Sequence, residues 1–308
     1  MSKWFMIVNP SSASASKGDS WKDFLKILTD GGLEVEPLLT ERPAHAIELA
    51  QKAAEGGARQ FIAVGGDGTI HEVMTGLLRY SEQSKTDMGE FTLGVIPYGT
   101  GNDWIKTSGV PADLTKAAGC IIAGKTAKED VVKMTFSNGI FCMANIGGVG
   151  IDADICYNTN SLKTKGYKGD ILYKMVAPYS ILSKQRYPAE ITCDGEVVFK
   201  GKLLTAVIGN GVYRGGGIKQ NQEGGNWNDG LLEVSIMGDV NRFKGLSNMM
   251  HVFSGDFAVL PGIITRRFRK MEIKPLGKPH RVEADGEIPG TLPLTVEYIG
   301  QQINIIVP

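Results

Sequence analysis

The sequence predicts an α/β domain with a parallel sheet, followed by a β-rich domain that forms an antiparallel sandwich. Three observations support this fold class. Residues 1–130 alternate short apolar runs with segments of helical periodicity, which is typical of a parallel sheet covered by helices. From residue 131 most apolar runs resemble strands and are separated by Gly and Asn turns. The length of 308 residues favours two domains, which we expect at 1–130 and 131–308.

The first domain is expected to contain strands that alternate with helices. The strands are predicted from the apolar runs at 4–8, 33–39, 61–64 and 91–96. The helices are predicted where apolar or alanine-rich positions recur at helical spacing, at 21–28, 43–55, 70–77 and 114–123. Paired glycines after the first two helices are a common helix stop.

The second domain is expected to be built mainly from antiparallel strands. These strands are predicted at 131–136, 139–144, 189–193, 203–208, 231–236, 267–273 and 303–307. A helical stretch at 171–182 is the main exception.

Charge and residue spacing exclude several classes of function. Lys+Arg and Asp+Glu each number 33, so the formal net charge is zero. Because nucleic-acid-binding proteins usually carry a net positive charge, we expect no nucleic-acid partner. The 4 cysteines include no C-x-x-C pair and the 4 histidines are far apart, which argues against a disulfide scaffold and a zinc site. No apolar stretch approaches the roughly 18 residues of a membrane span, and the first run is too short for a signal peptide, so we expect a cytoplasmic protein.

Two glycine-rich turns follow predicted strands of the first domain. The first is Gly65-Gly66-Asp67-Gly68-Thr69 and the second is Gly99-Thr100-Gly101-Asn102-Asp103. Glycines let main-chain N–H groups approach an anion, and a following helix contributes the positive end of its dipole. Ligands of open α/β sheets bind at the carboxyl ends of the strands. A turn of this kind can be purely structural, but its position between a strand and a helix favours a phosphate site.

Residues 119–126 match the Walker A pattern literally, with Gly119 at the start and Gly124-Lys125-Thr126 at the end. A phosphate loop of this type needs a strand before it and a helix after it. Here the preceding segment is expected to be a helix and the following segment a strand. We therefore expect Gly124 to end a helix and not to bind phosphate.

The two glycine-rich turns, in this order, resemble those of the diacylglycerol kinase and sphingosine kinase superfamily, and within it the bacterial soluble lipid kinases. The first turn is also shared with NAD kinases and, loosely, with phosphofructokinases, so the resemblance implies an N-terminal domain of that type. The other matching segments keep the family's order and span nearly the whole chain: Asn9-Pro10, Thr40, Asp130, 147–152, 209–211, 228–234 and 285–287.

The resemblance implies a role for each matching position. The residues that would line ATP are Asn9, Thr40, Gly65, Gly66, Asp67, Gly68, Thr69, Glu72, Thr100, Gly101, Asn102 and Asp103. Asp67 and Asp130 would hold a catalytic Mg²⁺. Asp229, with main-chain carbonyls near Asn226 and Leu231, would hold a second, structural Mg²⁺. Glu287 would be the general base that accepts the proton of the substrate hydroxyl, with the chemistry in the cleft between the domains.

The resemblance further implies the partners of the protein. The substrate would be a membrane lipid, diacylglycerol or a related lipid, met by peripheral contact at the inner face of the membrane. Independently of the resemblance, a basic cluster at Arg266, Arg267, Arg269 and Lys270 would suit anionic headgroups, although a solvated strand face is the more usual explanation and is slightly favoured. A homodimer is one open possibility. Two rival functions remain: a kinase of a soluble substrate, such as an NAD kinase, and a non-catalytic lipid-binding protein with the same fold.

Overall fold

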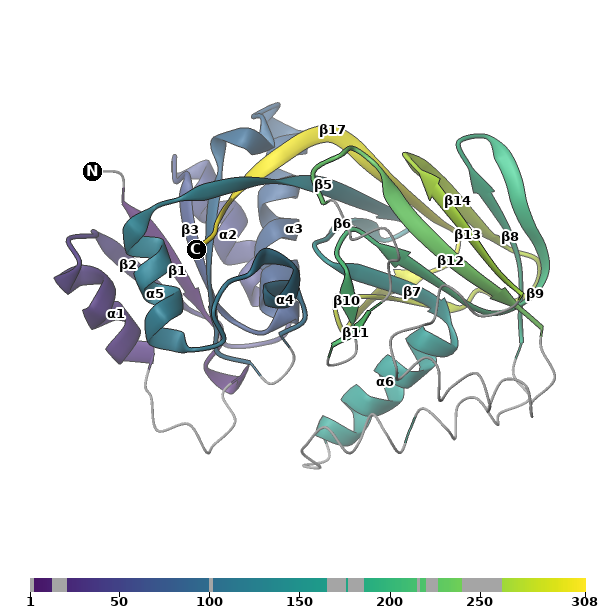
Figure 1. The fold of residues 1–308 in the computed structure, drawn as a ribbon, viewed down its shortest axis with the longest axis horizontal. Coiled ribbons are helices and arrows are strands. Elements are labelled where there is room, and N and C mark those ends of the chain that lie inside the picture. The colour runs from purple at the N-terminus through teal and green to yellow at the C-terminus, as the bar shows by residue number, and fades with distance from the viewer. Residues whose placement is uncertain are drawn as a thin grey trace. The chain divides into compact units, whose positions relative to one another are not determined.

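The computed structural model describes residues 3–12, 21–99, 102–164, 176, 186–214, 217–219, 227–239 and 262–308 (Figure 1). The chain forms two compact units. Unit 1 comprises Met1–Val131, Phe141–Ala144 and Ile299–Pro308, and unit 2 comprises Val132–Ile140 and Asn145–Tyr298. Among the described residues, no helix combines the length and the apolar character needed to cross a membrane.

The sheet of unit 1 is parallel, as predicted. Its strands are β1 (Trp4–Val8), β2 (Val35–Leu39), β3 (Gln60–Gly65) and β4 (Thr92–Pro97). Their order is β2-β1-β3-β4, and the end of β17 (Leu294–Ile306) adds a further parallel strand beside β4. The helices are α1 (Trp21–Asp30), α2 (His45–Glu55), α3 (Asp67–Ser84), α4 (Trp104–Ser108) and α5 (Leu114–Ala123), with 3₁₀ turns η1 (Pro10–Ser12) and η2 (Met88–Glu90).

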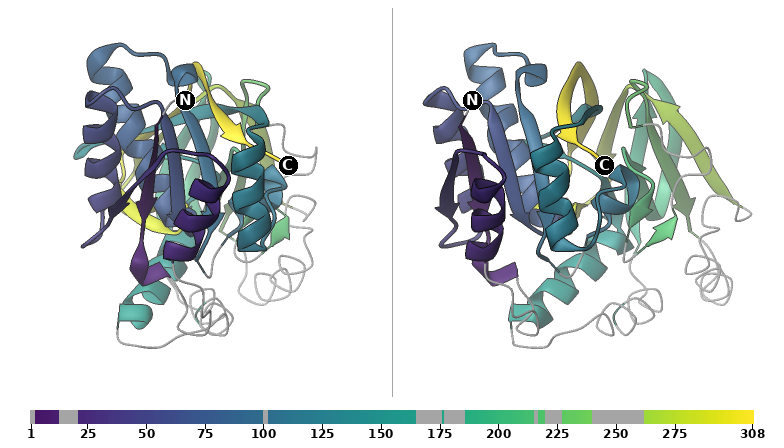
Figure 2. Two further views of the ribbon diagram at one scale, coloured as in Figure 1. Left: turned by 90° about the vertical axis from the view of Figure 1, so that its left-hand side faces the viewer. Right: turned by 60° about the vertical axis from the view of Figure 1, so that its left-hand side comes forward.

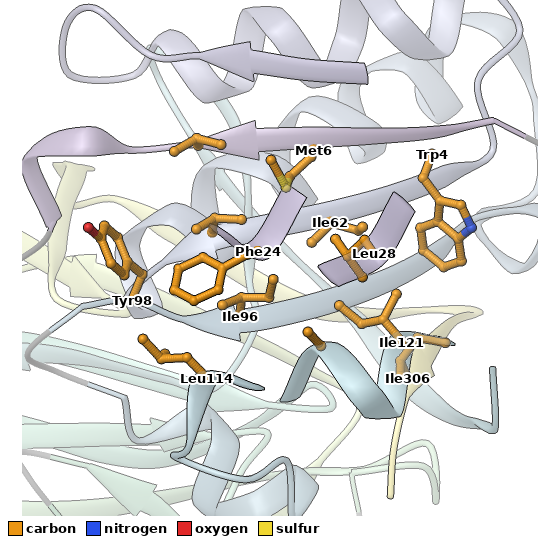
Figure 3. Close-up of a cluster of buried hydrophobic side chains, with 13 residues drawn as sticks. Trp4, Met6, Phe24, Leu28, Ile62, Ile96, Tyr98, Leu114, Ile121 and Ile306 are labelled. Atoms are coloured by element: carbon orange, nitrogen blue, oxygen red, sulfur yellow. The ribbon is translucent and has the colours of Figure 1, made fainter. Parts of the chain in front are cut away.

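Helices cover both faces of this sheet. Figure 2 shows α2 and α3 on one face and α1 and α5 on the other. Alternate strand residues point to the same face, so Met6, Ile62 and Ile96 pack together against α1 and α5 (Figure 3). Phe24 of α1 meets Tyr98 edge to face, with ring centroids 5.7 Å apart. This core fixes the strands whose carboxyl ends carry the two glycine-rich turns.

Unit 2 is antiparallel, in agreement with the predicted sandwich. Its elements after β5 (Thr126–Phe136) and β6 (Gly139–Met143) are β7 (Ile146–Gly150), α6 (Ile151–Thr164), β8 (Tyr187–Cys193), β9 (Glu196–Gly209), β10 (Tyr213–Arg214), β11 (Ile218–Lys219), β12 (Leu232–Gly238), β13 (Ile263–Phe268), β14 (Lys270–Pro275), β15 (Arg281–Ala284) and β16 (Glu287–Thr291). The long strand β9 pairs with β7, β8 and β12, and β15 joins β7 to β16.

The predicted secondary structure of unit 2 was wrong at one strand and lacked one helix. The segment predicted as one strand at 267–273 is two strands, because the main-chain N–H of Arg269 donates to the Asp194 carboxylate instead of a strand partner. Helix α6 was not predicted, and only its first two residues fall in the segment 147–152, which was noted as a match to the family. The helix predicted at 171–182 lies outside the described residues, apart from Val176.

The rejection of the Walker A match is confirmed. Residues 114–123 are helical as α5, Gly124 ends this helix with a φ of 71°, and β5 follows from Thr126. The segment therefore has the order helix, turn, strand, which is the reverse of a phosphate loop.

Candidate functional site

Three predicted nucleotide-site segments meet at the carboxyl ends of β1, β2 and β3. The main-chain N–H of Asn9 donates to the Val64 carbonyl at 3.0 Å, and that of Thr40 donates to the Val8 carbonyl at 2.9 Å. The Asn9 side-chain oxygen accepts the N–H and the hydroxyl of Ser11 at 3.1 and 2.7 Å. These bonds hold Asn9 and Thr40 beside the turn that follows β3.

The two glycine-rich turns pack too closely for side chains. A Cβ atom on Gly65 would lie 2.0 Å from the Thr69 hydroxyl oxygen, and one on Gly99 would lie 2.5 Å from the Gly66 Cα. Neither contact is tolerable, so both positions require glycine. Thr69 is buried, and its N–H donates to the Gly66 carbonyl at 2.9 Å, which starts α3 directly after the turn.

Asp67 joins the two turns. One oxygen of its carboxylate accepts the main-chain N–H of Asp103 at 2.9 Å, and the other accepts that of Trp104 at 3.1 Å. These N–H groups stand at the start of α4, where no helical partner exists for them. Each carboxylate oxygen has two lone pairs, so two such bonds fix Asp67 without exhausting its capacity to accept.

The rest of the second turn is held by local polar contacts. The Asn102 side-chain amide donates to the Gly99 carbonyl at 2.9 Å. Asp103 is buried, and its carboxylate lies 2.7 Å from the Lys106 ammonium. Lys106 thus adds a cation close to the turn that the sequence reasoning did not select. Thr100 and Gly101 lie outside the described residues.

Two charged residues on β5 belong to the same unit. Asp130 is only 1% exposed, and its carboxylate accepts the Gln302 amide at 2.8 Å. Glu129, which was not predicted, is 0% exposed and accepts the indole N–H of Trp104 on its two oxygens at 3.2 and 3.1 Å. The signal available in the sequence was an acidic pair directly before the apolar run Val131-Val132.

Glu72, predicted to line the nucleotide, supports a neighbouring helix. Its carboxylate accepts the main-chain N–H groups of Ala44 and Ala46 at 2.9 and 3.1 Å. These groups begin α2, and a carboxylate at this end also favours the helix dipole. Glu72 therefore stabilises the start of α2, whether or not it also contacts a ligand.

Glu287, the predicted base, stands in unit 2 beside a tight hairpin turn between β15 and β16. Asp285 and Gly286 have φ values of 51° and 84°, and Glu287 is exposed at the start of β16. The Asp285 carboxylate is buried and accepts the N–H groups of Asn145 and Ile146 at 2.8 and 3.1 Å on one oxygen. This aspartate therefore ties the turn to β7 and sets where β16 begins.

Residues of helix α6 also donate hydrogen bonds to this turn. The Asn160 amide and the Cys156 thiol both donate to the Gly286 carbonyl, at 2.8 and 3.1 Å. The helix itself is anchored because the Tyr187 hydroxyl donates to Asp154, and burial, followed by this bond, raises the pKa of Tyr187. Sequence reasoning missed Asn160 and Cys156, since their contact to Gly286 spans more than 120 positions of the chain.

The two implied magnesium sites differ in how well their residues suit the ion. Asp67 and Asp130 supply the hard carboxylate oxygens that Mg²⁺ prefers, and their other partners keep both carboxylates oriented. The described residues hold no cluster of three or more His, Cys, Asp or Glu side chains suited to a metal. A Mg²⁺ held by one or two carboxylates, phosphates and water does not need one. The chemistry of these two residues suits a catalytic ion, and their joint binding of one Mg²⁺ stays a prediction.

Asp229, predicted for the structural ion, has other partners. One of its oxygens accepts the Leu231 N–H at 3.1 Å, and the other accepts the Arg267 guanidinium in an ion pair. A guanidinium already neutralises this carboxylate, so the described residues do not suit a Mg²⁺ here. Asn226 lies outside the described residues.

Two family models together match most of the chain. Residues 3–134 match the model described as diacylglycerol kinase catalytic domain. Residues 146–307, more than half of the chain, match the model described as YegS C-terminal NAD kinase beta sandwich-like domain.

Curated proteins and solved structures show the same likeness over nearly the full length. The chain is 26% identical over 306 residues to a diacylglycerol kinase of Staphylococcus carnosus, which covers 98% of this chain and 94% of that protein. It is 27% identical to a diacylglycerol kinase of Bacillus subtilis, over 98% and 95% of the two chains. A crystal structure of a diacylglycerol kinase from Bacillus anthracis superposes with a TM-score of 0.69 over 99% and 97% of the two chains, and at 21% identity it supports the fold alone.

Proposed function

Since the chain belongs to the diacylglycerol kinase family, whose members are lipid kinases, we propose that it transfers the γ-phosphoryl group of ATP to a hydroxyl of a membrane lipid, with Mg²⁺. Diacylglycerol is the lipid named in its relatives and is the first substrate to test. The observation that carries the proposal is the pair of glycine-rich turns joined by Asp67 at the carboxyl ends of β3 and β4.

The proposed binding of ATP uses groups of unit 1. Main-chain N–H groups of the turn at 65–69, at the start of α3, would face the phosphates, because a helix N-terminus favours an anion. Asp67 and Asp130 would hold Mg²⁺, which neutralises charge on the phosphoryl oxygens when it is bound. Asn9 and Thr40 lie at the same ends of the sheet and would border the nucleotide.

Glu287 is the proposed general base of the reaction. It would accept the proton of the lipid hydroxyl as that oxygen bonds to the γ-phosphorus and the bond to ADP breaks. Its exposed carboxylate is accessible to a hydroxyl, and the surrounding turn is fixed by Asp285 and Asn160. A base carried by a fixed turn is effective because less ordering is left for the moment of reaction.

The membrane contact is proposed as peripheral and on the cytoplasmic side. Arg266 on β13, Lys270 on β14 and Arg269 between these strands are exposed and would meet anionic headgroups. Phe268 is buried in the fold, so the cluster would act through charge and not through an inserted ring.

The proposal is tested with purified protein, labelled ATP, Mg²⁺ and mixed micelles that contain diacylglycerol. Labelled lipid should form with the wild type and fall to background with Glu287→Gln. NAD is assayed in parallel, because an NAD kinase is the nearest rival. Labelled NAD without labelled lipid would replace the proposal by that rival, and lipid capture without any ATP turnover would replace it by a non-catalytic lipid-binding protein.

A further inference from the structure

The pair formed by Trp104 and Glu129 is a buried polar contact that the proposed reaction does not use directly. Trp104 is 1% exposed and Glu129 is 0% exposed. The indole N–H points at both oxygens of the carboxylate, at 3.2 and 3.1 Å. A contact to a charged acceptor is stronger than one between neutral groups, so it holds the ring in one orientation.

Trp104 touches the proposed metal site through its main chain. Its N–H donates to Asp67 at 3.1 Å, and the N–H of the preceding Asp103 donates to the other Asp67 oxygen at 2.9 Å. The orientation of the Asp67 carboxylate therefore depends on where the backbone at 103–104 lies. That backbone is tied through the Trp104 ring to Glu129, which directly precedes Asp130 on β5.

We propose that Trp104, held by Glu129, is a positioning residue that sets the Asp67 carboxylate for the metal and the phosphates. The role rests on the proposed function. It differs from that of a ligand, since neither side chain needs to touch ATP. The chain of contacts joins both proposed metal-binding positions: Asp67 through the Trp104 backbone, and Asp130 through its neighbour on the strand.

Packing alone is a poor reason for a glutamate at position 129. Burying a carboxylate costs much more than burying an apolar side chain of the same size, even when it is hydrogen-bonded. Apart from Glu129 and Asp130, the buried residues of this strand are apolar, among them Val131 and Val132. Strong burial of a charge beside a candidate site indicates a functional demand on its position.

Variants of the two residues separate positioning from packing. Trp104→Phe keeps most of the ring but loses the donor, whereas Glu129→Gln keeps an acceptor oxygen. The double variant Trp104→Phe/Glu129→Leu removes donor and acceptor together, so neither group is left without the other. Ile121→Ala, in the core of unit 1, is the control for a loss of stability without a change at Asp67.

The decisive readout is metal affinity, measured with Mn²⁺ by electron paramagnetic resonance in the presence of a non-hydrolysable ATP analogue. Thermal unfolding is followed for each variant, and affinities are compared at a temperature where all are folded. Glu129→Gln should bind Mn²⁺ within about twofold of wild type, whereas the double variant should bind at least about tenfold more weakly than Ile121→Ala. In kinase assays the same double variant should need correspondingly more Mg²⁺ for half-maximal rate.

The outcomes separate this proposal from the proposed function. If the double variant binds Mn²⁺ as tightly as Ile121→Ala while the wild type is an active lipid kinase, the positioning role is overturned and the function stands. If affinity falls as expected but the wild type phosphorylates no lipid, the positioning role stands and the function fails. A wild type that binds no Mn²⁺ with the nucleotide analogue contradicts both.

Discussion

Asp67 in unit 1 and Asp285 in unit 2 have the same kind of hydrogen bonding but differ in exposure and in role. Each precedes a glycine and accepts two successive main-chain N–H groups from a segment distant in sequence. Asp67 spreads these bonds over both oxygens and is partly exposed, whereas Asp285 gathers both on one oxygen and is buried. The same residue type thus carries the carboxylate of the proposed metal site in one unit and fixes a turn in the other.

In unit 2 the proposed chemistry belongs to the residue that follows the turn. The Asp285 carboxylate accepts hydrogen bonds from Asn145 and Ile146, whereas Glu287, two positions later, is exposed. In unit 1 the turn-joining aspartate is itself the proposed ligand. Variants of the two aspartates and their neighbours should therefore fail in different ways.

The largest effect is expected for Glu287→Gln. The amide keeps the size of the side chain but cannot accept a proton, so kcat should fall about 100-fold to 10,000-fold. Because Glu287 is exposed, the thermal midpoint should stay within the error of the measurement. A variant that keeps wild-type kcat would remove Glu287 from the base role.

A large effect on stability is expected for Asp285→Ala. The substitution leaves the buried N–H groups of Asn145 and Ile146 without their acceptor, at a cost of about 1–3 kcal/mol for each group. Urea unfolding should show this loss. Asp285→Asn is the matched control, since it keeps an oxygen for both donors. Equal loss in the two variants would mean that the charge, and not the hydrogen bonding, matters.

A smaller effect is expected for Asn160→Ala on α6. It removes one of the donors to the Gly286 carbonyl, and a single hydrogen bond contributes about 0.5–1.5 kcal/mol. If this bond energy is lost from the transition state, kcat should fall about threefold to tenfold. KM for ATP should stay unchanged. Asn158→Ala, on the same helix, is the control. A change confined to KM for ATP would contradict the assigned role.

The smallest effect concerns Asp229, a third aspartate with a different partner. Its ion pair with Arg267 is partly exposed, so Arg267→Met should lower the free energy of unfolding by no more than about 1 kcal/mol. Addition of EDTA should leave the thermal midpoint of the wild type unchanged. A clear drop with EDTA that Mg²⁺ reverses would show that this loop, or another site, holds a structural ion.

Local sequence signals predicted most of the fold and the two turns. The glycine at 65 and the helix stop at Gly124 have local causes, and each is found where it was expected. Gly99 was also found where its turn was predicted, although the contact that requires a glycine there is made with Gly66 of the other turn. Contacts between distant segments were not predictable. Helix α6, the Trp104 tie to Glu129 and the capping of α2 by Glu72 depend on which faces meet in three dimensions.

Strand alternation has a related limit. It says that Glu129 and Asp130 point to opposite faces of β5, but not that both faces are buried. The break at Arg269 depends on Asp194, which lies 75 positions earlier. Such long-range partners decide the details that a single sequence leaves open.

The most direct test of the central claim is the affinity for Mg²⁺–ATP, measured by titration calorimetry on the wild type and on Asp67→Asn. In this variant an amide nitrogen replaces one carboxylate oxygen of Asp67, and both oxygens accept a main-chain N–H in the wild type. The substitution therefore removes a hydrogen bond between the two turns and also weakens the proposed contact to the metal. We expect the wild type to bind and the variant to bind about tenfold to 100-fold more weakly. Equal affinity in the two proteins, or no binding by the wild type, would contradict the account.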